Sequence, residues 1–228
     1  MNSSLKFLPL ALLGLLIVLT TGCSSVSVQN LNHHADSGVP LEKPTAIYVL
    51  PFDTNGEFNV DRTGADLADF KAHLQQMMSA ALTTRFPTYL APSRAITSLP
   101  AAGNYWVVAG EFIRVNQGSR ALRVGIGFGA GGTKMETRVF VYDMASGGNP
   151  PAPFLTFETT GGSGAEPGLV AAMDPVSLAV SAVSGSAKGV TDDTLRTSRM
   201  ITASLSDYMY LRGWVSKEMR LQPKMKSQ

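Results

Sequence analysis

The sequence predicts an α+β domain in which helices cover a mostly antiparallel sheet of four to five strands, after a signal peptide and a flexible tether. Three observations support this fold class. Segments with strand or helix patterns follow one another in the order strand, helix, strand, strand, strand, an ambiguous segment and helix. The last two strand segments are joined by a short turn, which is typical of antiparallel pairing. The chain of 228 residues shows no internal repeat and suits one domain with a hydrophobic core.

Residues 1–22 indicate a bacterial lipoprotein signal peptide. Lys6 supplies a positive charge, residues 7–19 are almost all apolar, and Cys23, the only cysteine, follows small residues. The apolar run is short for a membrane-spanning helix, and the A-x-A-like site of a plain secretory signal is missing. Thr20 departs from the pattern, because lipoprotein signals usually carry leucine there. We expect diacylglycerol and N-acyl chains on Cys23, which would anchor the protein to a membrane.

Residues 23–44 are expected to form the lipidated cysteine and a flexible tether, because they are polar and lack periodicity. Ser24 resembles the residue that, in lipoproteins of two-membraned bacteria, permits export to the outer membrane. The expected location is therefore the periplasmic face of the outer membrane. The folded α+β domain is expected over residues 45–216, and a basic tail over residues 217–228.

The charge of the chain is nearly balanced, with 19 Lys and Arg against 17 Asp and Glu. So small an excess argues against a nucleic-acid binder. The tail is nevertheless basic and contains Lys217, Arg220, Lys224 and Lys226 against Glu218. Two interpretations stay open: a solvated, frayed end of the chain, or a contact for anionic lipid headgroups or polymers.

The first elements of the domain are a strand and a long helix. Residues 46–52 are rich in strand-forming side chains and end at Pro51 and nearby turn residues. A helix follows, with apolar residues at helical spacing: Leu67, Phe70, Leu74, Met77, Met78, Ala81, Leu82 and Phe86. Thr63 and Asp66 have the spacing of a capping box, and Pro87 is expected to stop the helix.

Three further strands are predicted over residues 105–115, 134–143 and 154–160, the last two as a hairpin. In residues 134–143, side chains alternate between two faces. Met135, Thr137, Val139 and Val141 share one face, and Glu136, Arg138, Phe140 and Tyr142 share the other.

The C-terminal part of the chain begins with an ambiguous segment over residues 161–190, rich in Gly, Ala, Ser and Val. Within it, Asp174 and Pro175 fit the start of a short helix that ends near Val183. Residues 192–212 predict the last helix, with Gly213 in the C′ position. Ile201, Leu205 and Tyr208 lie on one side of this helix.

The glycine-rich residues 120–132 match G-x-G-x-x-G, but a strand pattern follows them where a dinucleotide site needs a helix. We therefore expect no nucleotide. Two interpretations remain. The glycines make a bulged or flexible connection between strands, or Arg120, Arg123 and Phe128 form a partner-binding surface on an exposed strand edge.

No catalytic or metal-binding set of residues is found. His33 and His34 are adjacent, and His73 has no second ligand at helical spacing, so no metal site is predicted. There is no G-x-S-x-G motif and no evident carboxylate pair. The sequence therefore predicts a protein that is not an enzyme, with no cofactor beyond the lipid on Cys23.

A family resemblance comes from three segments: residues 108–113 (VAGEFI), residues 118–131 (GSRALRVGIGFGAG) and residues 139–143 (VFVYD). Together they resemble the uncharacterised bacterial lipoproteins known as domain of unknown function 4410, over about residues 46–164. The resemblance implies an architecture and an envelope location, but no active site.

These observations predict a non-enzymatic, lipid-anchored cell-envelope lipoprotein that acts as a binding or assembly module. Its partners would be the membrane and an envelope protein or a second copy of itself. The alternative is a self-assembling secretion or pore-type component that uses residues 165–190, because this segment has few charges. A third hypothesis, a cell-wall hydrolase, has no support from the residues.

Overall fold

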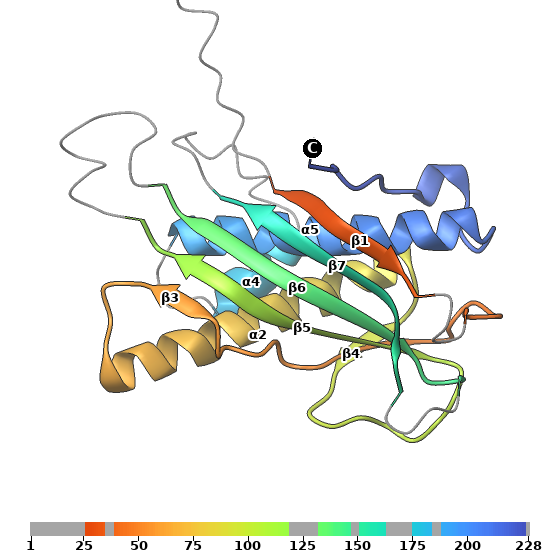
Figure 1. Ribbon diagram of the computed structural model, residues 1–228, viewed down its shortest axis with the longest axis horizontal. Coiled ribbons are helices and arrows are strands. Elements are labelled where there is room, and N and C mark those ends of the chain that lie inside the picture. The colour runs from red at the N-terminus through yellow and green to blue at the C-terminus, as the bar shows by residue number, and fades with distance from the viewer. Residues whose placement is uncertain are drawn as a thin grey trace, which may run out of the picture.

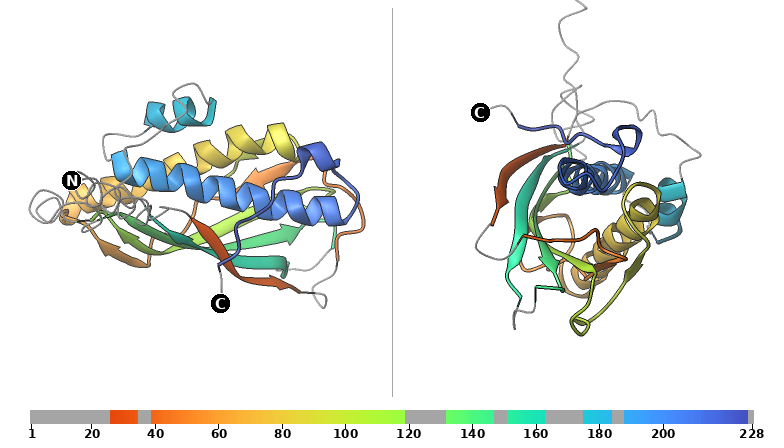
Figure 2. Two further views of the ribbon diagram at one scale, coloured as in Figure 1. Left: turned by 90° about the horizontal axis from the view of Figure 1, so that it is seen from above. Right: turned by 90° about the vertical axis from the view of Figure 1, so that its right-hand side faces the viewer.

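The computed structural model describes residues 26–34, 39–118, 132–146, 151–162, 175–183 and 188–226. In these residues a seven-stranded mixed sheet is covered on one face by two long helices, with a shorter helix outside them (Figures 1 and 2). The strands are β1 (Ser27–His33), β2 (Ile47–Val49), β3 (Glu57–Asn59), β4 (Ser93–Ala95), β5 (Trp106–Asn116), β6 (Lys134–Asp143) and β7 (Pro153–Gly161). The helices are α2 (Gly64–Tyr89), α4 (Pro175–Val183) and α5 (Lys188–Leu211), followed by the 3-10 turn η2 (Lys217–Met219).

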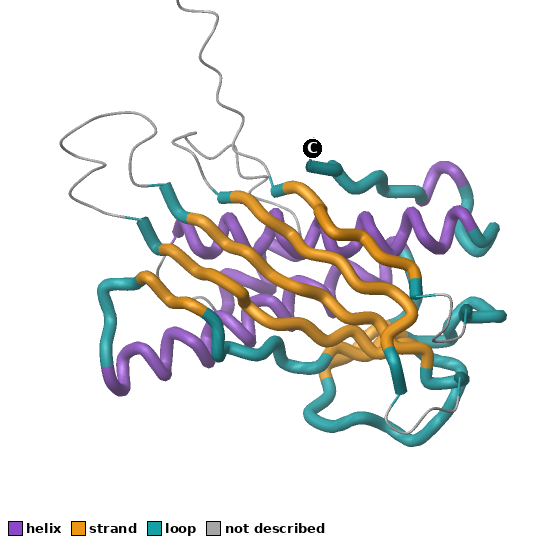
Figure 3. Tube along the Cα trace, in the orientation of Figure 1, coloured by secondary structure: helices purple, strands orange, loops and turns teal. Residues whose placement is uncertain are grey.

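The α+β class is confirmed, but the expectation of a mostly antiparallel sheet of four to five strands is wrong. The strand order is β1-β7-β6-β5-β2-β4, and β3 pairs with β5 (Figure 3). Strands β6 and β7 are antiparallel as predicted, and β5 also pairs antiparallel with β6. In contrast, β2 and β3 run parallel to β5, and β4 runs parallel to β2. Helix α2 carries the chain back between β2 and β4, which parallel pairing requires. Strands of three residues are too short to show an alternating pattern in the sequence.

Strands β2 and β3 pair with the same edge of β5, one after the other along its length. Asp53 bridges to Glu111 between them, and its side chain accepts a hydrogen bond from the Asn55 amide at 2.6 Å. Phe52 packs above Gly110, where a Cβ atom would lie 2.4 Å from the ring. Gly110 therefore makes the space that lets this large side chain enter the core.

Helix α2 buries the predicted apolar face, including Phe70, Leu74 and Phe86. We expected the helix to stop at Pro87, but it continues to Tyr89. Because Pro87 lies in the last turn, it removes little of the helical hydrogen bonding. Thr63 is the N-cap with extended backbone, but its side chain makes no capping hydrogen bond. The predicted start of the helix is thus confirmed, whereas the predicted capping box is not formed.

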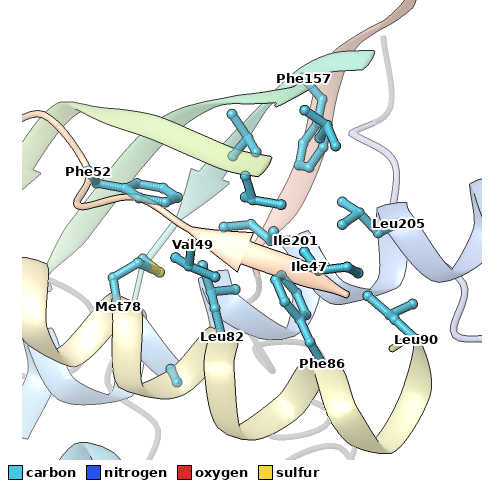
Figure 4. Close-up of a cluster of buried hydrophobic side chains, with 14 of the residues drawn as sticks. Ile47, Val49, Phe52, Met78, Leu82, Phe86, Leu90, Phe157, Ile201 and Leu205 are labelled. Atoms are coloured by element: carbon cyan, nitrogen blue, oxygen red, sulfur yellow. The ribbon is translucent and has the colours of Figure 1, made fainter. Parts of the chain in front are cut away.

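The core lies between the sheet and the two long helices (Figure 4). The side chains of Ile47 and Val49 of β2 are fully buried and lie between the sheet and α2, with α5 beside them. The residues drawn in this region include Met78, Leu82 and Phe86 from α2, Leu90 directly after it, and Ile201 and Leu205 from α5. The predicted faces of β6 are also confirmed, since Met135, Thr137, Val139 and Val141 are buried.

The last predicted helix is confirmed as α5, and the short helix predicted from Pro175 to Val183 is confirmed as α4. Residues 201–206 of α5 are all buried, although several of them are polar. The hydroxyls of Thr202 and Ser204 donate to carbonyl groups one turn earlier, at 2.8 and 3.0 Å. These bonds satisfy the polar groups inside the helix itself, so this part of the helix can be buried on all sides.

Parts of the segments expected as a flexible tether (residues 23–44) and as a basic tail (residues 217–228) belong to the fold of the described residues. Residues 27–33 form β1, which pairs antiparallel with β7. Residues 217–226, here called the strap, cross α5 and reach β1 at Val28. The polar composition of both segments concealed this, because an edge strand and a surface strap bury few side chains. Among the described residues, no helix combines the length and apolarity needed to cross a bilayer.

Candidate functional site

Four strands have a terminus at the same end of the sheet, the end opposite Val26. The antiparallel registers place the last residue of β1 beside the start of β7 and the end of β6 beside the start of β5. His33, Phe154, Asp143 and Trp106 therefore lie at one end of the sheet, although they are far apart in the sequence.

The C-terminus of α5 reaches the same end of the sheet. Gly213 adopts a positive φ of 73°, and its amide donates to the Tyr210 carbonyl at 2.9 Å. The Trp214 amide donates to the Met209 carbonyl at 2.9 Å. This pair of bonds is a Schellman motif, as the glycine at C′ predicted. The turn directs Trp214 back onto the helix that it follows.

Aromatic rings from these elements form one cluster. Trp106 lies 4.8 Å from Phe154 and 6.0 Å from Trp214, measured between ring centroids. Tyr208 lies 5.2 Å from Phe154, and the His33 ring stacks on it at 5.6 Å with an interplanar angle of 19°. Such pairs each stabilise by about 0.5–1.5 kcal/mol beyond their buried area. The cluster thus fixes the end of α5 to the ends of β1, β5 and β7.

Arg212 covers the outer side of this cluster. Its guanidinium carbon lies 5.5 Å from the centroid of the Tyr208 ring and 5.9 Å from that of Trp214. Its Nη2 donates to the Tyr208 hydroxyl at 3.2 Å. A cation is therefore held against two aromatic faces while the residue itself stays exposed.

An open pocket of about 240 Å³ lies over the cluster. Its lining combines aromatic, apolar and basic side chains: His33, His34, Val39, Phe154, Tyr208, Leu211 and Arg212. Two of these are exposed apolar residues, Leu211 at 67% and Val39 at 41%. The His34 ring is held in place by its contact with the Thr156 hydroxyl, at 2.8 Å from Nε2.

A second, more polar pocket of about 480 Å³ adjoins the first and shares Val39 with it. Its lining includes the carboxylates of Glu42 and Asp143, the amide Asn104 and Leu41, which is 90% exposed. Asp143 is only 7% exposed, and its Oδ1 accepts a hydrogen bond from the Ala145 amide at 3.1 Å. We call the aromatic cluster, the two pockets and their exposed rim together the aromatic end.

Burial alters the acidity of two groups at the aromatic end. It raises the pKa of the Asp143 carboxyl, against the opposing hydrogen bond from the Ala145 amide. It also raises the pKa of the Tyr208 hydroxyl, an effect that Arg212 opposes and the Asp143 charge reinforces. Both groups favour their neutral forms more than an exposed side chain would.

The chemistry of the aromatic end suits binding of another molecule. It offers aromatic faces, exposed aliphatic side chains, a basic group and carboxylates. Within the described ranges, no three His, Cys, Asp or Glu side chains come close enough together to hold a metal ion. His73, on the exposed side of α2, instead contacts the Asp69 carbonyl at 2.7 Å through Nδ1.

The outer face of the sheet carries a row of ion pairs far from the helices. Arg138 lies between Glu111, at 2.6 Å, and Glu158, at 2.8 Å. Burial acts to raise the pKa of Glu158, but hydrogen bonds from Arg138, Gln29 and Asn30 outweigh it and hold that pKa below its usual range. These charges satisfy one another, and exposed pairs of this kind contribute little to stability.

The residues that the sequence marked for function are not among those at the aromatic end. Cys23, Arg120, Arg123 and Phe128 lie outside the described residues, as does most of the segment 165–190. The aromatic end was not predicted from the sequence, although a signal was present. Both tryptophans of the chain belong to it, and residues 208–214 (YMYLRGW) concentrate aromatic side chains and an arginine around the predicted helix end.

The solved structures that resemble this chain include the following two, and both likenesses are weak. A structure described as a PelC dodecamer from Paraburkholderia phytofirmans has a TM-score of 0.38 and 12% identity, covering 75% of this chain and 97% of that one. The hypothetical protein CT253 from Chlamydia trachomatis has a TM-score of 0.28 and 14% identity, covering 45% and 63%. A search of curated proteins found no match.

The family comparison is more informative, because the model of Domain of unknown function (DUF4410) matches residues 47–177. The match begins at β2 and ends in α4, so β1, α5 and the strap lie beyond it. Tyr208, Arg212 and Trp214 of the aromatic end are therefore outside the matched part. The matched residues make up more than half of the sequence, and the chain belongs to the DUF4410 family.

Proposed function

We propose that this protein is a non-enzymatic, lipid-anchored lipoprotein of the cell envelope that binds a segment of another envelope protein at the aromatic end. The anchor would be Cys23, at the periplasmic face of the outer membrane. The observation that carries the proposal is the pocket over Tyr208 and Phe154, with Val39, Leu41 and Leu211 exposed around it and its neighbour.

The composition of the aromatic end supports a protein partner. Tyrosine, tryptophan and arginine are the residues most enriched at the energetic centres of protein interfaces. Monomeric proteins usually expose apolar side chains singly, whereas Val39, Leu41 and Leu211 line two adjoining pockets. The carboxylates of Glu42 and Asp143 beside them would favour a partner segment that carries a basic residue.

The place of the aromatic end relative to Cys23 also supports the proposal. Cys23 lies four residues before Ser27, the first residue of β1, so even an extended chain holds the start of β1 within about 14 Å of the anchor. His33 lies at the other end of β1, about 20 Å along the strand. An anchored molecule can therefore present the aromatic end to the periplasm, with its folded domain close to the bilayer.

The test compares two exposed leucines. Leu211, on the pocket rim, is 67% exposed, and Leu178, on α4, is 63% exposed. Replacing either with arginine should leave the fold intact, since neither side chain is in the core. After crosslinking in cells, the proposal expects Leu211→Arg to lose a specific envelope protein that the wild type and Leu178→Arg both retain. Equal recovery with all three chains would refute the site.

A self-assembling secretion or pore-type component is the second candidate. The observation in its favour is α4, a helix without charged residues that exposes Leu178. It predicts that crosslinking yields only multiples of this chain, and that Leu178→Arg abolishes them. Mass spectrometry of the mature N-terminus tests the anchor separately, through the acyl mass on Cys23.

A further inference from the structure

The strap brings the C-terminal lysines to the start of β1. The Val28 amide donates to the Lys224 carbonyl at 2.7 Å, and the Lys226 amide donates to the Val28 carbonyl at 2.8 Å. In Figure 1 the C-terminus lies beside the N-terminal end of β1, after the chain has run back along α5. The end of the strap therefore pairs with Val28, which lies only five residues after Cys23 in the sequence.

The strap is held in this position by side chains as well as by β1. Arg220 pairs with Asp207 of α5 at 2.6 Å and lies 4.2 Å from the centroid of the Tyr210 ring. The Ser206 hydroxyl donates to the Met219 carbonyl at 3.1 Å and accepts from the Leu221 amide at 2.9 Å. The end of the strap is therefore fixed relative to the domain and is not a frayed tail.

The last described residues have the composition of a membrane-surface contact. Lys224, Met225 and Lys226 are all exposed, and the apolar Met225 is 50% exposed between the two cations. The Lys226 ammonium group donates to the neutral Gln29 amide oxygen at 3.0 Å. A basic, apolar, basic sequence of this kind suits the interface of an anionic bilayer, where lysines meet phosphates and an apolar side chain enters the headgroup layer.

The acids on the neighbouring strands pair with basic groups of the sheet itself. Lys134 pairs with Glu136 at 2.8 Å, and Arg114 lies 2.9 Å from Glu57 and 3.6 Å from Glu136. The carboxylate of Glu158 accepts hydrogen bonds from Arg138 and from two amide side chains of β1. The negative charge of the sheet is thus balanced largely within the sheet, while the strap as a segment contains more basic than acidic residues.

From this geometry, and relying on the proposed anchor at Cys23, we infer that the end of the strap binds the anionic headgroups of the membrane that holds the acyl chains. Acyl chains and strap would then form two contacts on one side of the domain. Two contacts restrict the tilt of an anchored domain far more than one. The strap would keep the aromatic end pointing away from the bilayer.

The test uses the acylated mature chain, which would begin at Cys23, in vesicles. Because Cys23 is the only cysteine and its thiol is acylated in this form, Met225→Cys introduces one reactive thiol for a fluorophore. Leu211→Cys serves as the matched control at the opposite end of the sheet. The quenching of this fluorophore by headgroup-labelled lipid is then compared between vesicles of phosphatidylcholine alone and vesicles of phosphatidylcholine mixed with phosphatidylglycerol.

The inference expects strong quenching at position 225 that requires phosphatidylglycerol, and weak quenching at position 211 in both vesicles. Adding Lys224→Gln and Lys226→Gln should lower the ratio of docked to undocked strap by about fivefold for each lysine. Equal quenching at position 225 in both vesicles, or no effect of the lysine changes, would overturn the inference and leave the anchor intact. A chain that fails to float with vesicles in high salt would instead refute the anchor.

Discussion

Trp106 and Trp214 lie 6.0 Å apart, so the only two tryptophans of the chain belong to one cluster at the aromatic end. Trp106 is fully buried at the start of β5, and Trp214 is partly buried just after α5. Their rings join the sheet to the helix through Tyr208, which lies 5.8 Å from Trp106. The intrinsic fluorescence of the protein therefore reports on the region that we propose to bind a partner.

Replacing Gly213 with alanine should lower the free energy of unfolding by about 1 kcal/mol, because its positive φ is unfavourable for a side chain. A Cβ atom at this position would meet no other atom within 4 Å, so backbone strain is the only cost. Chemical denaturation followed by tryptophan fluorescence measures the change. Gly213→Asn should lose less, since asparagine tolerates this conformation; equal losses would contradict the assignment of strain.

Replacing Gly110 with alanine should destabilise the domain by about 2 kcal/mol, because the new methyl group would overlap the Phe52 ring. The Phe52 backbone cannot move away freely, since the adjacent Asp53 amide donates to the Gly110 carbonyl at 2.8 Å. Thermal unfolding of Gly110→Ala, Phe52→Leu and the double variant gives a double-mutant cycle. We expect the double variant to be less unstable than the sum of the two changes; strict additivity would contradict the contact.

Replacing Asp143 with asparagine should stabilise the protein at neutral pH. Burial raises the pKa of Asp143, so the folded chain holds this proton more tightly than the unfolded chain does. Its contribution therefore favours folding at acid pH and is lost as the pH rises through the raised pKa. The asparagine side chain would keep an acceptor oxygen for the Ala145 amide without the charge. Melting temperatures at neutral pH and below the usual aspartate range test this, and a gain at acid pH only would contradict it.

Replacing Arg220 with alanine should cost about 1–2 kcal/mol, because the Asp207 carboxylate loses a partly buried charged partner. The strap should also separate from β1 more often. Hydrogen exchange of the Val28 amide measures this directly, since its acceptor is the Lys224 carbonyl. Lys217→Ala, at an exposed position of the same segment, is the control. Unchanged exchange at Val28 in Arg220→Ala would show that the pair does not hold the strap.

The elements that the sequence predicted correctly are those with long, regular patterns. Helix α2 shows its apolar face from Leu67 to Phe86, and β6 alternates over its whole length. The helix end at Gly213 was predictable because the C′ position favours a residue that accepts positive φ. Local patterns of this kind depend on neighbours in the sequence, so they survive without knowledge of the fold.

The rest depends on contacts between distant residues. Strands β3 and β4 have three residues each, and β1 is polar because it lies at an edge. His33, Trp106, Phe154 and Tyr208 come together only through the strand registers and the packing of α5. No spacing in the sequence predicts such a cluster. The glycine-rich residues 120–132, in contrast, are contiguous and therefore recognisable in the sequence as a candidate site.

The most direct test of the proposed binding site is site-specific photo-crosslinking in living cells, with a photoreactive amino acid at Leu211 or at Leu178. The two positions have almost the same exposure and lie on different helices. The proposal predicts that the residue at position 211 captures a discrete envelope protein, that Tyr208→Ala weakens this capture, and that position 178 does not capture it. The same products from both positions, or capture at 211 that Tyr208→Ala leaves unchanged, would contradict a binding site at the aromatic end.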